Sequence, residues 1–203
     1  NMLLYYSPGA CSLSPHIALC ESGLDFTPVR ASTKTHKLDD GTDYYSINPL
    51  GYVPLLELDG GEQLHEGPAI LQYIANQVPD KQLAPANGTL ARYQLQSWLN
   101  FIATEVHKGF SPLFNPATPA DYKKMCLDRL GQRLQWVNDQ LQDGGYVMGE
   151  QFTVADGYLF TVTNWAKPMN LDLSHLDKLV ALRQRISERP AVIAAMKAEG
   201  LIK

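Results

Sequence analysis

Cysteine is scarce in this chain, and positive charge is not in excess. Only three cysteines occur among the 203 residues, namely Cys11, Cys20 and Cys126, and their spacing matches no metal motif. This odd and sparse set argues against a disulfide framework, and it predicts a reducing, cytoplasmic setting without a metal. The formal net charge of −4 provides no basic surface for nucleic acid.

Long apolar runs near the start are also missing. The apolar run there is only LLYY, which is far too short for a secretory signal or a membrane span. Hydrophobic residues nevertheless make up 45% of the chain, which is ample for a packed core. We therefore expect a globular protein that neither crosses a membrane nor binds nucleic acid.

Cys11 is the most informative residue of the sequence. It lies in MLLYYSPGACSLSPHIALCESG, between a predicted strand and a helix predicted over about residues 12–22. The positive end of a helix favours thiolate over thiol, so Cys11 is a candidate nucleophile. The spacing CSLS lacks a second cysteine, so a partner thiol would have to come from outside. The alternative is that Cys11 is a small buried apolar residue.

The first eighty residues show an α/β pattern, and the remainder is helical. Phe26 to Arg30 reads as a second strand, and VPLLELDGGEQLHEG reads as a hairpin that leads into the helix AILQYIANQV. We place an α/β domain at 2–80, a Pro- and Gly-rich linker at 81–87, and an all-helical domain at 88–203. Pro54 directly follows Val53, so the peptide bond between them is a candidate for the cis form.

The helical part carries three recognisable signals. Leu95, Leu99, Ile102 and Val106 predict an amphipathic helix that runs to about Phe110. Further helices are predicted over 127–141, 176–189 and 191–198. In FTVAD, Thr153 and Asp156 have the spacing of a capping box.

Three further groups are candidates for a binding site. In HEGPAI, Glu66 and the helix start at Gly67 suit an amino-acid head group, although Glu66 also suits a helix N-terminus simply as a charge. Val53 offers a strand edge to an extended peptide. A polar row on the long helix contains a histidine that we expect to titrate near neutrality, unless the row is an ordinary solvated face; its members are Asn100, Thr104, His107 and Lys108, with Glu105 beside them.

Aromatic residues of the helical part offer an apolar pocket. Their default reading is the core of the helical domain. The residues concerned are Phe110, Phe114, Tyr158 and Trp165.

Taken together, these strings resemble the bacterial beta-class glutathione transferases. The matching strings are YYSPGACSLSPHIAL, NPLGYVPLLELDGG, EGPAI, WLNFIATEVHKGFSPLF, FTVADGYLF and AEGLIK. The resemblance implies a thioredoxin-like N-terminal domain, an all-α C-terminal domain, a cytoplasmic homodimer and glutathione as cosubstrate.

The resemblance also implies residue roles. Cys11 would lie beside the glutathione sulfur and form a mixed disulfide with it, and His107 would reach the same sulfur, with Lys108 beside it. Val53, before a cis Pro54, would pair with the cysteinyl unit. Glu66 and Gly67 would hold the γ-glutamyl end, while other residues would reach across from the partner subunit, namely Asn100, Thr104 and Glu105.

Two positions depart from the family pattern. His36 stands where a lysine is frequent near the glycine carboxylate of glutathione, and Gly67 replaces a common serine. Because free imidazole loses its charge near pH 6.5, we predict that glutathione binding weakens between pH 6 and 8.

The resulting expectation is a glutathione transferase that conjugates glutathione to small hydrophobic electrophiles, with a redox side activity through Cys11. One alternative is a glutaredoxin-like oxidoreductase, which the CSLS spacing favours. Another is a carrier that binds apolar ligands without turnover.

Overall fold

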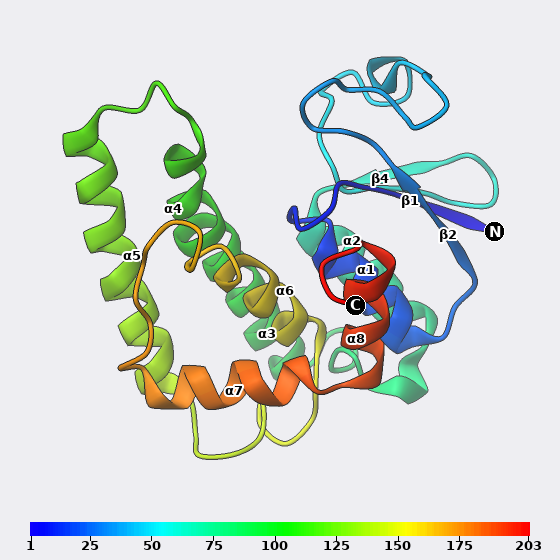
Figure 1. Ribbon diagram of the computed structural model, residues 1–203. Helices are drawn as coiled ribbons and strands as arrows, with labels where there is room; N and C mark the ends of the chain where they lie inside the picture. The colour runs from blue at the N-terminus through cyan, green and yellow to red at the C-terminus, as the bar shows by residue number, and fades with distance from the viewer. The chain divides into compact units, whose positions relative to one another are not determined.

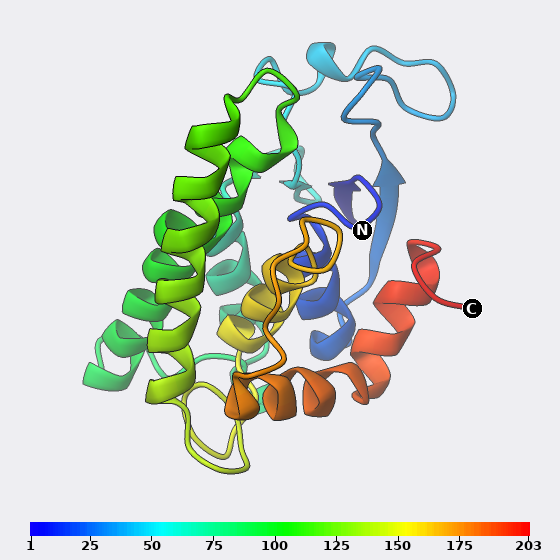
Figure 2. The same ribbon diagram turned by 60° about the vertical axis from the view of Figure 1, so that its left-hand side comes forward.

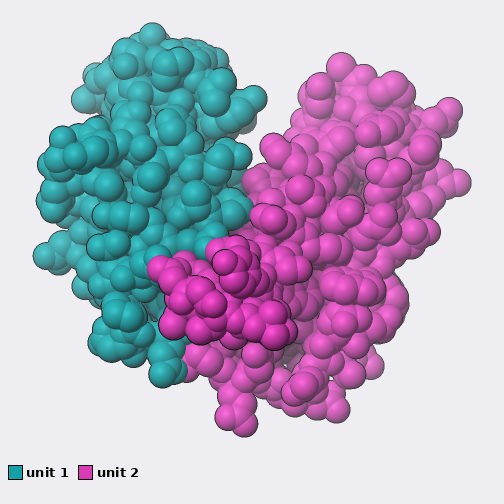
Figure 3. All heavy atoms as spheres, turned by 180° about the vertical axis from the view of Figure 1, so that it is seen from behind, with its two compact units in different colours: residues 1–84, 188–203 teal, residues 85–187 magenta.

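The structure is a computed structural model that describes all residues from 1 to 203. It divides into two compact units, residues 1–84 with 188–203 (unit 1) and residues 85–187 (unit 2), which Figure 3 colours separately. The sequence placed 188–203 with the helical domain. In the structure this segment groups with unit 1, because helix α8 (Pro190–Ala198) buries Val192 and Ala195 and packs against α1 (Leu13–Ser22), as Figure 1 shows.

Unit 1 contains a mixed four-stranded sheet. Strand β1 (Met2–Tyr6) is central and pairs in parallel with β2 (Phe26–Arg30) and antiparallel with β3 (Leu55–Glu57). Strand β4 (Gln63–His65) completes the order β2-β1-β3-β4. The predicted second strand and the predicted hairpin are thus confirmed, and parallel pairing of β1 with β2 requires the crossover that α1 provides.

The helices of unit 1 follow the sequence signals. Helix α1 ends at Gly23, whose φ of 74° allows its N–H to reach the Leu19 carbonyl. Helix α2 (Gly67–Gln77) buries Ile70, Leu71 and Ile74, and a short 3-10 turn, Pro79–Lys81, follows it. A second 3-10 turn, Tyr44–Ser46, lies in the polar segment between β2 and β3.

Unit 2 is entirely helical. Its elements are α3 (Leu90–Phe101), a π-helical segment (Ile102–His107), α4 (Lys108–Phe110), a 3-10 turn (Ser111–Phe114), α5 (Ala120–Gln140), α6 (Val154–Thr163) and α7 (Asp177–Ser187). Helix α5 packs along the α3–α4 stretch in both ribbon views (Figures 1 and 2). None of the helices combines the length and apolar character that a membrane crossing requires.

Two predictions for unit 2 need correction. The long helix reaches Phe110 as predicted, but its middle is π-helical, so i+7 spacing does not describe one face there. Helix α5 begins at Ala120 and not at Leu127. The sequence pattern missed its first two turns because they are largely exposed and carry no apolar period.

The capping box of α6 is confirmed. The Thr153 hydroxyl accepts from Ala155 N–H at 3.3 Å, and Asp156 Oδ2 accepts from Thr153 N–H at 2.8 Å. Asp156 is fully buried, and its Oδ1 also accepts from Val147 N–H at 2.8 Å. This one carboxylate therefore fixes both the start of α6 and the loop that precedes it.

Candidate functional site

Cys11 lies in the loop between β1 and α1, as predicted. Its sulfur is 3.2 Å from the backbone oxygen of Val53, and the contact is a hydrogen bond from S–H to the carbonyl. A thiolate has no proton to donate, so this contact belongs to the thiol form. Two residues that the sequence separates by 42 positions, and selects for different reasons, thus meet in unit 1.

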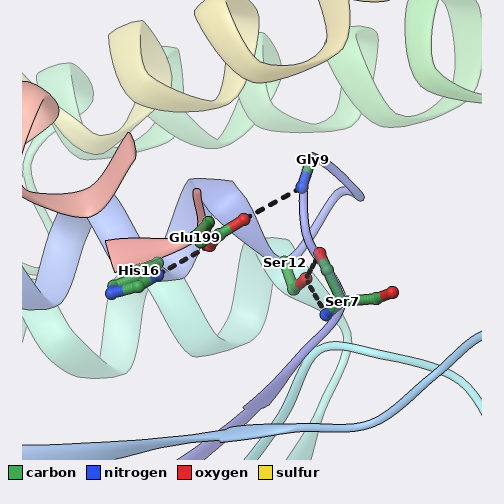
Figure 4. A network of polar contacts seen from close by, with 5 residues as sticks. All are labelled: Ser7, Gly9, Ser12, His16 and Glu199. Carbon is green, nitrogen blue, oxygen red and sulfur yellow. Dashed lines mark hydrogen bonds and ion pairs between the residues drawn. The ribbon is translucent and has the colours of Figure 1, made fainter. Parts of the chain in front are cut away.

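The Cys11 loop is held from the C-terminal segment. Glu199 Oε1 accepts from the Gly9 N–H at 3.0 Å, and Glu199 Oε2 lies 2.6 Å from His16 Nδ1 (Figure 4). Because a carboxylate only accepts, His16 Nδ1 carries the donated proton. Ser12 and Ser7 add a second link, in which the Ser12 hydroxyl accepts from Ser7 N–H at 3.1 Å.

Neither Glu199 nor His16 is a site residue in the sequence analysis. Both side chains are buried, with 0% and 2% exposure, and they are 183 residues apart. Only the unusual pairing of a buried glutamate with a buried histidine identifies them, and that pairing exists only after folding. They hold the loop and do not themselves point to a ligand.

Val53 precedes a cis peptide bond to Pro54, as predicted. The residue before it is anchored twice, because the Tyr52 carbonyl accepts from the Tyr44 hydroxyl and from the Asn48 side-chain amide, both at 2.8 Å. Tyr44 is fully buried in a cluster with Tyr5 and Val53, and burial raises the pKa of its hydroxyl to about 12. The predicted strand edge at Val53 needs correction, because β3 begins at Leu55 and pairs with both β1 and β4; Val53 lies just before the strand, on a rigid base.

Glu66 stands at the start of α2 with an exposed side chain and a strained backbone. Its φ is 71°, a region that residues with a Cβ rarely occupy. Its carbonyl accepts from Ile70 N–H at 3.0 Å, and the helix begins at Gly67 with Pro68 in the first turn. Strain of this kind clusters at functional positions, which supports a role for Glu66.

His36 also has a positive φ, of 56°. Its ring stacks on Tyr45 with the centroids 4.6 Å apart. A Cβ at Gly51 would lie 2.6 Å from Tyr45 Cε1 and 2.9 Å from His36 Cδ2, so glycine is needed there to admit the stacked pair. The imidazole is thus held in place without an ion pair.

In unit 2, His107 contacts Tyr158. His107 Nδ1 lies 2.6 Å from the Tyr158 hydroxyl, and the imidazole also packs against Trp165 at 5.3 Å. Burial, with a smaller contribution from Lys108, lowers the pKa of His107 to about 4. The expectation that His107 titrates near neutrality is therefore wrong, because desolvation disfavours the charged imidazolium.

The aromatic group predicted as a pocket gathers around Trp165. Phe110 and Phe114 meet its ring edge-on, at 5.9 Å and 5.3 Å. Phe110 and Tyr158 are buried, whereas Phe114 is 48% exposed and Trp165 is half-buried. Only Phe114 and Trp165 therefore present ring surface, and the two buried residues support them.

The polar row on the long helix is only partly kept together. The Thr104 hydroxyl donates to the Asn100 carbonyl at 2.9 Å, and Glu105 pairs with Arg133 of α5 at 3.3 Å. Lys108 is exposed, while His107 points to Tyr158. The π-helical segment separates these side chains, and the sequence period gave no sign of it.

Family models place both parts of the chain. The model "Glutathione S-transferase, N-terminal domain" matches residues 1–76, and "Glutathione S-transferase, C-terminal domain" matches residues 101–190. The chain belongs to the glutathione S-transferase family. The transferase is 50% identical to "Glutathione S-transferase GstA" of Escherichia coli O157:H7, over 98% of this chain and 100% of that protein.

Two solved structures agree. A beta-class glutathione S-transferase of Sphingomonas chungbukensis is 46% identical, covers 98% of this chain and 100% of its own, and superposes with a TM-score of 0.94. A sphingomonad glutathione S-transferase complexed with glutathione is 45% identical with the same TM-score and the same coverage. The predicted family, beta class and two-part fold of the transferase are confirmed, and the roles of individual residues stay predictions.

Proposed function

We propose that the transferase binds glutathione on unit 1, with the glutathione sulfur beside Cys11. The observation that carries this proposal is the 3.2 Å contact between Cys11 Sγ and the Val53 carbonyl, because it puts a thiol beside the backbone segment expected to pair with the cysteinyl unit. Glu66 and Gly67 hold the γ-glutamyl end, where free N–H groups at a helix start favour a carboxylate. His36 faces the glycine carboxylate.

Cys11 carries a thiol-transfer activity in this proposal. The Cys11 thiolate attacks the glutathionyl sulfur of a mixed disulfide, so that the old S–S bond breaks and the substrate leaves as a thiolate. A second glutathione thiolate then attacks the Cys11–glutathione disulfide. This step forms oxidised glutathione and restores the Cys11 thiolate, so one mixed disulfide and one glutathione thiolate yield one substrate thiolate and one oxidised glutathione.

Unit 2 supplies the electrophile side. Phe114 and Trp165 present the aromatic surface, which favours small apolar electrophiles. His107 acts as a neutral hydrogen-bonding group near the sulfur, since its low pKa keeps it uncharged above about pH 5. Lys108 adds positive charge, and in a cytoplasmic homodimer the partner-reaching residues are Asn100, Thr104 and Glu105.

Two reactions of the same protein samples test the proposal. We expect Cys11→Ala to abolish thiol transfer from a glutathione mixed disulfide, while conjugation of glutathione to 1-chloro-2,4-dinitrobenzene persists. Cys126→Ala, at a half-buried cysteine on α5, is the matched control and should leave both rates unchanged. Thiol transfer that survives Cys11→Ala would refute the redox role.

The glutaredoxin-like alternative keeps support from the CSLS spacing. It predicts that thiol transfer proceeds while no electrophile is conjugated at any glutathione concentration. Saturable binding of apolar ligands with neither reaction would instead favour a carrier. Sedimentation of the wild-type protein tests its oligomeric state, and we expect a homodimer at micromolar concentration.

A further inference from the structure

A cavity of unit 2 is separate from the aromatic group around Trp165. It has a volume of about 580 Å³ and lies between α3, the end of α5 and the loop that precedes α6. Its aromatic wall is formed by Trp98, Phe101 and Trp136, and no residue of the expected electrophile group lines it. The volume is in the range of small-molecule sites.

The three aromatic rings form one contiguous cluster. The Phe101 and Trp136 centroids are 4.7 Å apart, those of Trp98 and Trp136 are 5.6 Å apart, and those of Trp98 and Phe101 are 6.3 Å apart. Trp136 is 44% exposed, which leaves a large aromatic surface open to solvent. Ring faces attract cations through their quadrupole, and tryptophan does so most strongly.

The charged side chains that themselves line the cavity have one sign. Asp143 and Glu150 are exposed carboxylates in the lining, and the lining contains no lysine and no arginine. Of the two nearby arginines, Arg133 pairs with Glu105, whereas Arg185 donates to the carbonyl of the lining residue Gly145, so one guanidinium adjoins the cavity wall and is already hydrogen-bonded there. The remaining polar lining, glutamines and a serine, is neutral.

The loop that completes the cavity, which precedes α6, is already ordered without a ligand. Tyr146 and Gly149 exchange two backbone hydrogen bonds, of 2.6 Å and 3.1 Å, and Val147 N–H is held by Asp156. A Cβ at Gly145 would lie 2.8 Å from the Gly149 carbonyl oxygen, so glycine is required where the loop closes on itself. A wall that is already ordered does not lose conformational entropy when a ligand binds.

We infer that this cavity binds a small organic cation, of the quaternary ammonium class. The cation stacks on the faces of Trp98, Phe101 and Trp136, while Asp143 and Glu150 supply the compensating charge. This site is independent of the glutathione chemistry proposed for Cys11, and it involves no bond making or breaking. A neutral apolar ligand makes the same contacts with the rings but has no electrostatic attraction to the two carboxylates.

Choline and its neutral isostere 3,3-dimethylbutan-1-ol provide a matched pair of probes. We expect isothermal titration of the full-length wild-type protein to show saturable choline binding at least ten-fold tighter than that of the alcohol. Tryptophan fluorescence should change along the same binding curve, because two of the three tryptophans line the cavity. Equal binding of the two probes, or no saturable binding of either, would overturn the inference.

Variants separate the rings from the charges. Trp136→Leu keeps apolar bulk and should weaken choline at least five-fold, and Phe101→Leu serves the same purpose if the first variant does not fold. Asp143→Asn combined with Glu150→Gln should also weaken choline several-fold. Asp139→Asn is the matched control, since Asp139 is an exposed carboxylate on α5 outside the lining.

Two outcomes would contradict the inference in different ways. If Asp139→Asn weakens choline as much as the double variant does, then the general negative field of the protein is responsible and no defined site exists. If Trp136→Leu changes the sedimentation coefficient in the absence of probe, while choline fails to bind the wild type, then a second copy of the chain covers the rings.

Discussion

The carboxylate of Glu199 accepts a hydrogen bond from the backbone N–H of Gly9, which lies 190 residues earlier in the chain. Gly9 has a φ of 71° and belongs to the loop that carries Cys11. The other oxygen of Glu199 binds the buried His16 of α1. The C-terminal segment thereby fixes the loop and the helix that flank the candidate nucleophile, and Glu199 acts as a positioning residue.

Replacing Glu199 tests this positioning. Glu199→Ala removes the acceptor that the half-buried Gly9 N–H and the buried His16 imidazole share, so we expect a loss of about 3 kcal/mol in the free energy of unfolding. Glu199→Gln keeps one side-chain oxygen, which can accept from Gly9 N–H or from His16 but no longer from both through separate oxygens. We therefore expect a smaller loss of unfolding free energy than in Glu199→Ala. Urea unfolding measures both variants, with Glu62→Gln, at an exposed position of unit 1, as the control.

The readout that separates positioning from plain stability is the rate of thiol transfer through Cys11. At 25 °C, where both variants remain folded, Glu199→Ala should lower kcat more than it raises KM for glutathione. Unchanged kcat together with lower stability would show that the tether is structural only.

We predict that Glu66 lowers the stability of the fold and strengthens the binding of glutathione. Because its φ is 71°, Glu66→Gly relieves backbone strain and should raise the free energy of unfolding by about 1 kcal/mol. The same change removes the carboxylate proposed to hold the glutathione ammonium, so KM for glutathione should rise about ten-fold. Glu66→Gln keeps the strained Cβ and is the matched variant: its KM should rise while its melting temperature stays at the wild-type value.

At Gly67, in contrast, we predict a substitution that strengthens glutathione binding. Its Cβ would meet nothing within 4 Å, and its φ lies outside the left-handed region, so a serine fits without strain. We expect Gly67→Ser to add a hydroxyl donor at the helix start and to lower the dissociation constant of glutathione several-fold. Gly67→Ala separates the hydroxyl from the methylene. Calorimetric titration in which serine and alanine behave alike would contradict the donor role.

Much of this fold was readable from the sequence because its signals are local. The turn at Gly23, the hairpin before α2 and the capping box of Thr153 and Asp156 each depend on residues a few positions apart. The resemblance of short strings to a known family supplied the rest of the candidate glutathione site.

The features that the sequence could not reveal depend on contacts between distant residues. The tie between Glu199 and Gly9 joins the two ends of the chain, and the low pKa of His107 results from burial that only the folded unit creates. The π-helical segment leaves the apolar stripe readable but changes which polar side chains lie together. Periodicity reports the side of a helix that is buried, and it does not report the charge state of a group on that side.

We predict that His107 makes the stability of unit 2 decrease at acidic pH. Its pKa falls from an ordinary 6.5 to about 4 on folding, so the unfolded chain binds more protons between these values. Stability is therefore fully present above pH 6.5 and falls as the pH decreases toward 4, by about 3 kcal/mol at 1.4 kcal/mol for each pKa unit. Urea unfolding of wild type and His107→Gln across this range should show a smaller fall in the variant. The exposed His175→Gln is the control, and parallel curves for all three proteins would contradict the assignment.

Asp156 is expected to be the most sensitive carboxylate of unit 2. Its two oxygens accept from Thr153 N–H and Val147 N–H, and the side chain is fully buried. Asp156→Ala leaves both amides unsatisfied and removes the cap of a buried helix, so the free energy of unfolding should fall by about 3 kcal/mol. Asp177→Ala, at an exposed carboxylate in the first turn of α7, removes a similar charge without these contacts and should cost less than about 1 kcal/mol. Equal losses in the two variants, measured by urea unfolding, would mean that helix charge and not the buried hydrogen bonds sets the effect.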